Sequence, residues 1–142
     1  MSASGRPVHR RRRSLVLVWV GGSLGTGARY GLLQRIPELG RVPVGTLLAN
    51  VLGAFLLGLL LERLLRAGPD AGGRRDLRLL AGTGFLGGFT TYSTLATDVV
   101  GLLQAGEVGR ATGYALATLL LGGLATALGV RCGGGSWTGR RS

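Results

Sequence analysis

The fold of this chain is decided by the stretch Gly82-Thr83-Gly84-Phe85-Leu86-Gly87-Gly88-Phe89-Thr90-Thr91-Tyr92-Ser93-Thr94-Leu95. It lies inside the apolar segment Leu77–Leu103, which is long enough to cross a bilayer as a helix. Paired glycines loosen a helix, and hydroxyl groups in hydrocarbon are tolerated only where they face protein, water or an ion. The stretch therefore predicts a membrane helix that is broken at its centre and handles a small polar solute.

Three further apolar runs accompany this segment, and each approaches or exceeds the roughly 20 residues that a membrane-spanning helix needs. They are Leu15–Leu33, Val44–Leu65 and Ala111–Val130. The pattern predicts an all-α membrane protein with four transmembrane helices joined by short connections. Four short helices enclose little interior, so we expect any pathway to require an oligomer.

The basic residues are distributed as topology signals. All 17 are arginine, and the formal net charge is +11. Thirteen lie in segments that share one side of a four-helix bundle, namely the N-terminal tail, the second loop and the C-terminal end, whereas three lie on the other side. By the positive-inside rule both termini are expected in the cytoplasm, with the bundle in the plasma membrane. No basic face of a soluble surface is formed, so no nucleic-acid partner is expected.

These observations predict three parts in the chain. Residues 1–14 form a basic cytoplasmic N-terminal tail, residues 15–131 form the four-helix transmembrane domain, and residues 132–142 form a flexible C-terminal tail rich in glycine, arginine and serine. Small residues at four-residue intervals, such as Gly84 and Gly88, predict close helix–helix packing within the bundle.

Two strongly polar residues lie within the first two apolar runs. Arg29 either extends to the membrane interface or lines a positive vestibule that attracts anions, because an intramembrane guanidinium is costly otherwise. Asn50 lies in the middle of the second run, where its amide either holds two helices together or offers donors to an anion. The residues leave both choices open.

In the last run, Tyr114 and Thr118 lie one helical turn apart on the same face. They form either part of an aromatic interfacial belt or a track of hydroxyl groups. Asp98 lies near the end of the third run and is expected to be a solvated interfacial carboxylate rather than a proton carrier.

The polar groups expected inside the membrane are mostly hydrogen-bond donors. They include no central carboxylate, no histidine pair and no nucleophile–base arrangement, so an enzyme is not expected. Donors without acidic groups suit a small hard anion, whereas carbonyl groups freed at the glycines suit a cation. The donors are Arg29, Asn50, Thr90, Thr91, Tyr92, Ser93, Thr94, Tyr114 and Thr118.

Taken together, these motifs resemble the small bacterial fluoride channels called Fluc or CrcB. The resemblance covers nearly the whole hydrophobic chain, with its three motifs in order on the first, second and third helices. The motifs are Gly21-Gly22…Gly25…Ala28-Arg29-Tyr30, Gly45-Thr46-Leu47…Asn50 and Gly84-Phe85-Leu86-Gly87-Gly88-Phe89-Thr90-Thr91-Tyr92-Ser93-Thr94.

The resemblance implies a passive, fluoride-selective channel that exports fluoride from the cytoplasm and relieves its toxicity. It implies an antiparallel dimer of the dual-topology type, with two pores along the subunit interface and a central structural sodium ion (Na+). Gly87 and Thr90 match the positions whose main-chain carbonyls hold that sodium. The implied anion pathway comprises Arg29, Asn50, Tyr92, Ser93, Thr94, Tyr114 and Thr118.

The sequence departs from the family pattern at Leu95. The family usually frames the Ser93-Thr94 pair with two phenylalanines, and here Tyr92 and Leu95 stand in those positions. This leaves open a pore-deficient structural subunit of a heterodimeric channel. The strong arginine bias likewise leaves open whether the partner is a second copy or an inverted paralogue. A small multidrug-type transporter is a weaker alternative, because it requires a carboxylate in the first helix and none is present.

Overall fold

The structure, a computed structural model, describes residues 8–134 of the 142-residue chain. Of the tails predicted over residues 1–14 and 132–142, residues 1–7 and 135–142 lie outside the described residues, whereas 8–14 belong to the first helix and 132–134 to the last. Within residues 8–134 the chain is helical, and only an isolated bridge pairs Leu39 with Val42. The elements are α1 (Val8–Leu33), α2 (Val44–Ala67), α3 (Gly72–Leu77), η1 (Arg78–Leu86), α4 (Gly87–Phe89), α5 (Tyr92–Gln104) and α6 (Val108–Gly134).

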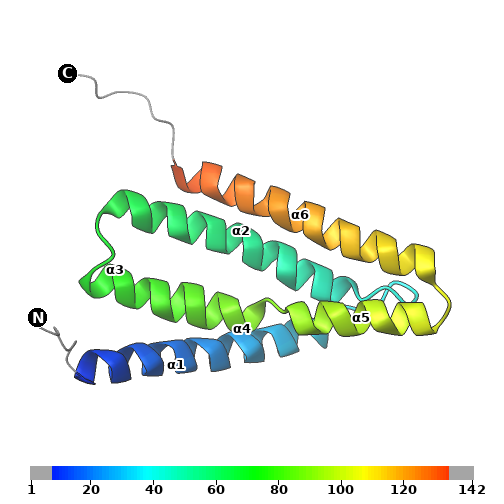
Figure 1. The fold of residues 1–142 in the computed structure, drawn as a ribbon, viewed down its shortest axis with the longest axis horizontal. Coiled ribbons are helices and arrows are strands. Elements are labelled where there is room, and N and C mark those ends of the chain that lie inside the picture. The colour runs from blue at the N-terminus through cyan, green and yellow to red at the C-terminus, as the bar shows by residue number, and fades with distance from the viewer. Residues whose placement is uncertain (1–7, 135–142) are drawn as a thin grey trace, which may run out of the picture.

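These elements form four long helical segments, of which α3, η1, α4 and α5 together make the third (Figure 1). Successive segments run in opposite directions, so that α1 begins and α6 ends at the same end of the bundle. α2 packs along α6, and α1 packs along η1 and α4. The all-helical, four-segment prediction is confirmed.

The helices extend beyond the apolar runs at several ends. α1 begins at Val8, seven residues before the run Leu15–Leu33, so the helix extends into the arginine segment. α6 likewise begins and ends outside the run Ala111–Val130. The helices continue beyond the apolar residues because arginine, although charged, is a good helix former. Two helices, α2 and α6, are long and apolar enough to cross a membrane.

Glycines bring α1 into backbone contact with the third segment. A methyl group on Gly25 would overlap the carbonyl oxygen of Phe85, and one on Gly84 would lie 2.9 Å from Cα of Gly21. Gly58 of α2 and Gly129 of α6 likewise allow close backbone contact between these two helices. A methyl group on Gly58 would lie 2.5 Å from the Thr126 carbonyl oxygen. Small residues permit this approach in lipid, where van der Waals packing holds helices together.

The third segment is not one regular helix. Arg78–Leu86 form a π-helix, and the helical backbone then continues through Gly87 and Gly88 to Phe89. Thr90 (φ −83°, ψ 153°) and Thr91 (φ −151°, ψ 121°) are extended, and α5 begins at Tyr92. The extended residues therefore lie after the glycine pair and not at it. Gly88 remains helical and contacts the Gly22 backbone of α1.

Candidate functional site

Asn50 of α2 binds the main chain at the extended residues. Its Nδ2 donates to the Thr91 carbonyl oxygen at 3.0 Å, and its Oδ1 accepts from the Thr91 N–H at 2.7 Å. In a continuous helix the Thr91 amide would donate to the Gly87 carbonyl, four residues earlier. Asn50 therefore takes this donor and leaves the Gly87 carbonyl without its helical partner.

The Thr91 side chain has a similar effect at the start of α5. Thr91 is the N-cap residue, and its Oγ1 accepts from the Thr94 N–H at 3.1 Å. That amide would otherwise reach the Thr90 carbonyl through a helical bond. The main-chain carbonyls of Gly87 and Thr90 thus both lose their helical donors, and these are the two carbonyls that the resemblance associates with sodium.

Arg29 of α1 links the two sides of the extended segment. Its Nε donates to the Gly88 carbonyl oxygen at 3.2 Å, and its Nη1 donates to Thr94 Oγ1 at 3.1 Å. The side chain is half-buried and faces α4 and α5. Arg29 is thus hydrogen-bonded within the subunit, to the main chain of α4 and to a side chain of α5.

Hydroxyl groups cluster at the first turn of α5. Thr91 Oγ1 lies 3.1 Å from Ser93 Oγ and donates to Thr94 Oγ1 at 3.0 Å. Ser93 is exposed, Tyr92 is 82% exposed, and this turn contains no acidic residue. The positive end of the helix dipole lies at the same place. Hydroxyl donors, a ring edge and a helix N-terminus beside a guanidinium together suit an anion.

Tyr114 and Thr118 lie inside the subunit, 4% and 6% exposed. Thr118 Oγ1 donates to the Tyr114 carbonyl. The single proton of the Tyr114 hydroxyl group has two acceptors within reach, Asp98 Oδ2 at 3.1 Å and the Pro43 carbonyl oxygen at 3.4 Å. The belt interpretation of Tyr114 is therefore wrong, because its ring packs against α5. Asp98 is half-buried and accepts the hydrogen bond from Tyr114.

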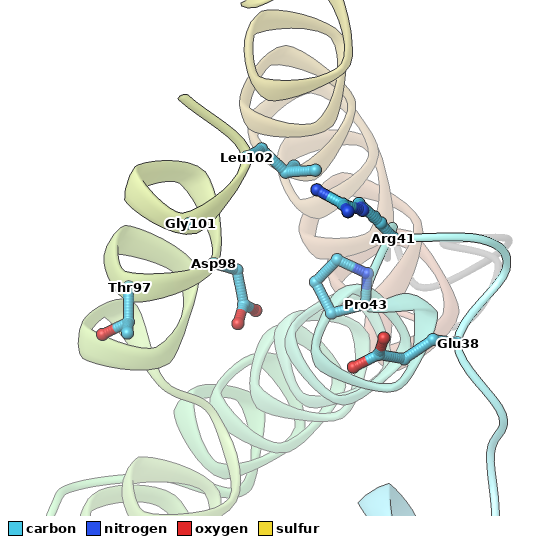
Figure 2. A pocket seen from close by; sticks show the side chains of 7 residues that line it. All are labelled: Glu38, Arg41, Pro43, Thr97, Asp98, Gly101 and Leu102. Atoms are coloured by element: carbon cyan, nitrogen blue, oxygen red, sulfur yellow. The ribbon is translucent and has the colours of Figure 1, made fainter. Parts of the chain in front are cut away.

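A pocket of about 250 Å³ opens beside Asp98, between α5 and the loop that precedes α2. Figure 2 shows the carboxyl groups of Asp98 and Glu38 turned toward the same space. The seven lining residues are Glu38, Arg41, Pro43, Thr97, Asp98, Gly101 and Leu102. Sequence reasoning missed Glu38 and Arg41, because nothing in a loop sequence indicates that it folds back over a helix.

Thr46 is a further residue that the sequence did not single out beyond its place in a motif. It is 1% exposed and lies beside Asp98 and Tyr114. Its Oγ1 has no hydrogen-bond partner of good geometry within the described part of the chain. The polar residues thus form two clusters. The first surrounds the extended segment and consists of Arg29, Asn50, Thr91 and Thr94. The second lies between α2, α5 and α6 and consists of Thr46, Asp98, Tyr114 and Thr118.

Leu95 belongs to the buried apolar core between α5 and α6. It is 8% exposed and clusters with Leu102, Ala111 and Tyr114. Tyr92, its counterpart in the family pattern, is 82% exposed. The two positions that frame the Ser93-Thr94 pair therefore have opposite environments within this subunit.

Leu95→Ala is expected to lower the free energy of unfolding by about 2–5 kcal/mol, because a buried side chain is removed and a cavity remains. Thermal unfolding of the purified protein in detergent measures this loss. Leu103→Ala is the matched control, since Leu103 lies on the same helix and is exposed. Equal shifts for the two variants would contradict the buried position of Leu95.

Comparison with known proteins places the whole arrangement in one family. The sequence model of the family described as "CrcB-like protein, Camphor Resistance (CrcB)" matches residues 16–130. The chain is 52% identical over 130 residues to fluoride-specific ion channel FluC 2 of Leifsonia xyli subsp. xyli, an alignment that covers 92% of this chain and 90% of that protein.

Two further relatives agree with this assignment. A fluoride-specific ion channel FluC of Thermus thermophilus is 47% identical over 121 residues, covering 84% of this chain and 92% of that protein. Fluoride-specific ion channel FluC 1 of Cutibacterium acnes is 46% identical over 116 residues, covering 80% and 81%. The resemblance found in the sequence motifs is confirmed: the chain is a membrane protein that belongs to the CrcB family, the family of the FluC ion channels.

Proposed function

We propose that this chain is a passive, fluoride-selective channel subunit that exports fluoride from the cytoplasm and relieves its toxicity. The observation that carries the proposal is the start of α5, where exposed Tyr92 and Ser93 and half-buried Thr94 lie beside the Arg29 guanidinium. No acidic residue in this turn opposes an anion. The names of the relatives, which are fluoride-specific channels rather than enzymes, supply the identity of the ion.

The chemistry of fluoride explains why such residues suit its pathway. Fluoride is small and strongly hydrated, so a pore must replace its water with hydrogen-bond donors. The Ser93 and Thr94 hydroxyl groups are such donors, and the Tyr92 ring offers a positive edge. One Nδ2 hydrogen of Asn50 binds Thr91, and the amide has a second for an ion. For Tyr114 and Thr118 to extend the pathway along α6, the hydrogen bond from the Tyr114 hydroxyl group to Asp98 must first break.

The carbonyls of Gly87 and Thr90 fit a structural sodium ion. Carbonyl oxygens are suitable ligands for a hard cation. Asn50 and the Thr91 side chain divert the two amides that would otherwise donate to these carbonyls, and Gly87 is exposed on the bundle surface. Sodium would supply fixed positive charge and hold the extended segment in place, and the same carbonyls of a second subunit would complete its shell.

The subunit is proposed to act in an antiparallel dimer. A groove of about 350 Å³ runs along α2 and η1 and includes both Gly87 and Thr90. Its lining residues are Leu57, Leu61, Arg78, Gly82, Thr83, Leu86, Gly87 and Thr90. A mostly apolar groove of small and aliphatic residues fits a packed helix of another subunit. Contact there would bring the two sets of carbonyls together.

The arginine bias bears on the identity of that partner. Described arginines at the end of the bundle where α1 begins include Arg12, Arg13, Arg74 and Arg75. The bias favours one orientation in the plasma membrane, with both termini in the cytoplasm. A chain fixed in one orientation would need an oppositely oriented paralogue as its partner, whereas a chain that inserts both ways could pair with a second copy. Cysteine-accessibility tagging of both termini tests this, and a substantial population with external termini would remove the argument.

The direct test is to reconstitute the purified chain in liposomes and follow fluoride efflux with a selective electrode, with chloride efflux as the control. Fast fluoride efflux without chloride efflux would support a channel that functions as a homodimer. Fluoride efflux that appears only after addition of an inverted paralogue would make the chain half of a heterodimer. No fluoride efflux in either preparation would refute the proposed activity.

A second candidate function is that of a pore-deficient structural subunit. The specific observation is that Leu95 packs into the core of its own subunit, so Tyr92 is the one aromatic ring of the Tyr92–Leu95 pair. In that case a heterodimer that contains this chain would have one conducting pore, lined by the aromatic rings of the partner subunit. Tyr92→Ala would then leave the efflux of the heterodimer unchanged, whereas it would lower efflux if this chain lines a pore.

A further inference from the structure

A pocket of about 300 Å³ lies at the end of the bundle where α1 begins and α3 lies (Figure 1). Arg13 and Ser14 line it from α1, Asp70 lines it from the connection between α2 and α3, and Arg75 and Asp76 line it from α3. None of these residues belongs to the proposed anion pathway or to the proposed sodium site. The pocket therefore has no part in the function proposed above.

The two carboxyl groups that line the pocket are each bound by an arginine. Asp76 Oδ2 lies 2.7 Å from Nη2 of Arg13. Asp70 accepts from Nε of Arg78 at 3.1 Å and from Nη2 of the same residue at 2.8 Å. The hydrogen bonds from Arg78 lower the pKa of Asp70, which therefore stays charged and paired at neutral pH.

Arg75 is the guanidinium that these pairs leave over. It is half-buried and lines the pocket, and it makes no hydrogen bond or ion pair with any other residue between 8 and 134. The charge of Asp70 acts on it only through space. Arg13, Arg75 and Arg78 together exceed the two aspartates by one positive charge. A guanidinium without a partner in a pocket suits the paired oxygens of a phosphate group.

An exposed apolar strip of α1 adjoins the pocket. Val16 and Val20 follow Arg13 at positions i+3 and i+7, so the three residues share one face of the helix. Val16 is 57% exposed and Val20 is 37% exposed. The charged pocket thus continues into an apolar surface at the level where the first apolar run begins. A soluble anion would use only the pocket, whereas a phospholipid would use both surfaces.

We propose that this pocket is a binding site for an anionic phospholipid, whose phosphate group binds Arg75 while an acyl chain lies along Val16 and Val20. Basic pockets at the ends of membrane helices are suited to anionic head groups. The single negative charge of a phosphodiester matches the single surplus positive charge, whereas the choline group of a zwitterionic lipid adds a positive charge. The site is independent of fluoride transport, and its occupant would link α1 to α3.

The test is native mass spectrometry of the full chain in detergent, titrated with dioleoyl phosphatidylglycerol or with dioleoyl phosphatidylcholine. The unfolding temperature is measured in the same mixtures, because a lipid that binds the folded protein stabilises it. The wild type should bind phosphatidylglycerol more tightly and gain stability from it. Arg75→Gln should weaken this binding about tenfold through loss of a hydrogen bond to a charged group. Ala71→Glu, which adds a carboxylate at an exposed position of the pocket lining, should also weaken it.

Arg63→Gln is the matched control. It removes the same charge from an exposed position near the same end of the bundle, outside the pocket lining, and should leave the affinity for phosphatidylglycerol unchanged. Equal weakening by Arg63→Gln and Arg75→Gln would overturn the inference, because binding would then depend on total charge alone. Equal affinity of the wild type for the two lipids would also overturn it. Inorganic phosphate that stabilises the wild type as strongly as phosphatidylglycerol would exclude the lipid as the occupant. None of these measurements requires transport, so their failure is distinct from failure of the proposed function.

Discussion

Asn50→Asp is expected to lower fluoride efflux at least about tenfold, since one part-buried hydrogen bond is lost and a negative charge is added. The carboxylate can still accept from the Thr91 N–H, but it cannot donate to the Thr91 carbonyl, which then faces a negative oxygen. The charge would also repel fluoride in the half-buried region around the extended segment. Efflux from liposomes measures the loss of transport, and thermal unfolding in detergent measures the loss of the hydrogen bond.

Gln34→Glu provides the same amide-to-carboxylate change at an exposed position beyond the end of α1. It should leave both efflux and unfolding temperature close to those of the wild type. Unchanged efflux in Asn50→Asp would remove Asn50 from the pathway. If Asn50→Asp were to lower stability alone, the residue would serve only to hold the main chain of Thr91.

Gly25→Ala is expected to disrupt the packing of α1 against η1 and α4. The added methyl group would overlap the carbonyl oxygen of Phe85, and this contact is with backbone that cannot rotate away. Overpacking of a close contact costs about 1–3 kcal/mol or more. The expected result is a lower unfolding temperature, because α1 would be pushed away from Phe85 and the hydrogen bond from Arg29 to Thr94 would be strained or lost.

Gly27→Ala is the matched control on the same helix. A methyl group at Gly27 would meet no atom within 4 Å, so the change should be neutral or slightly stabilising through the better helix propensity of alanine. Similar effects of the two substitutions would show that α1 does not pack through Gly25. The pair therefore tests the helix contact independently of any transport measurement.

Much of the architecture could be predicted from the sequence, because it depends on local properties. Four apolar runs specify four helical segments through their length alone. Gly84 and Gly88, spaced four apart, indicated a closely packed face, and the structure places both against α1. The ends of the helices were less well predicted, since arginines continue α1 and α6 beyond the apolar residues.

The site was predicted less completely. The sequence indicated that Asn50, Arg29 and the hydroxyl residues were polar groups without an obvious partner. It also suggested that the glycines would open the helix, whereas Gly87 and Gly88 remain helical and the extended residues are Thr90 and Thr91. No local signal distinguishes these possibilities, because the choice depends on a side chain from another helix.

By itself, the sequence determined the all-helical membrane class, the family and the donor-rich character of the third segment. Only the tertiary structure decided which donors and acceptors meet. Asn50 and Thr91 are 41 residues apart, and Arg29 and Thr94 are 65 residues apart. Hydrogen bonds require distances near 3 Å and defined directions, so such pairs exist only once the helices are packed. Hydropathy and spacing are properties of the chain, whereas the pairing of distant hydrogen-bond donors and acceptors is a property of the fold.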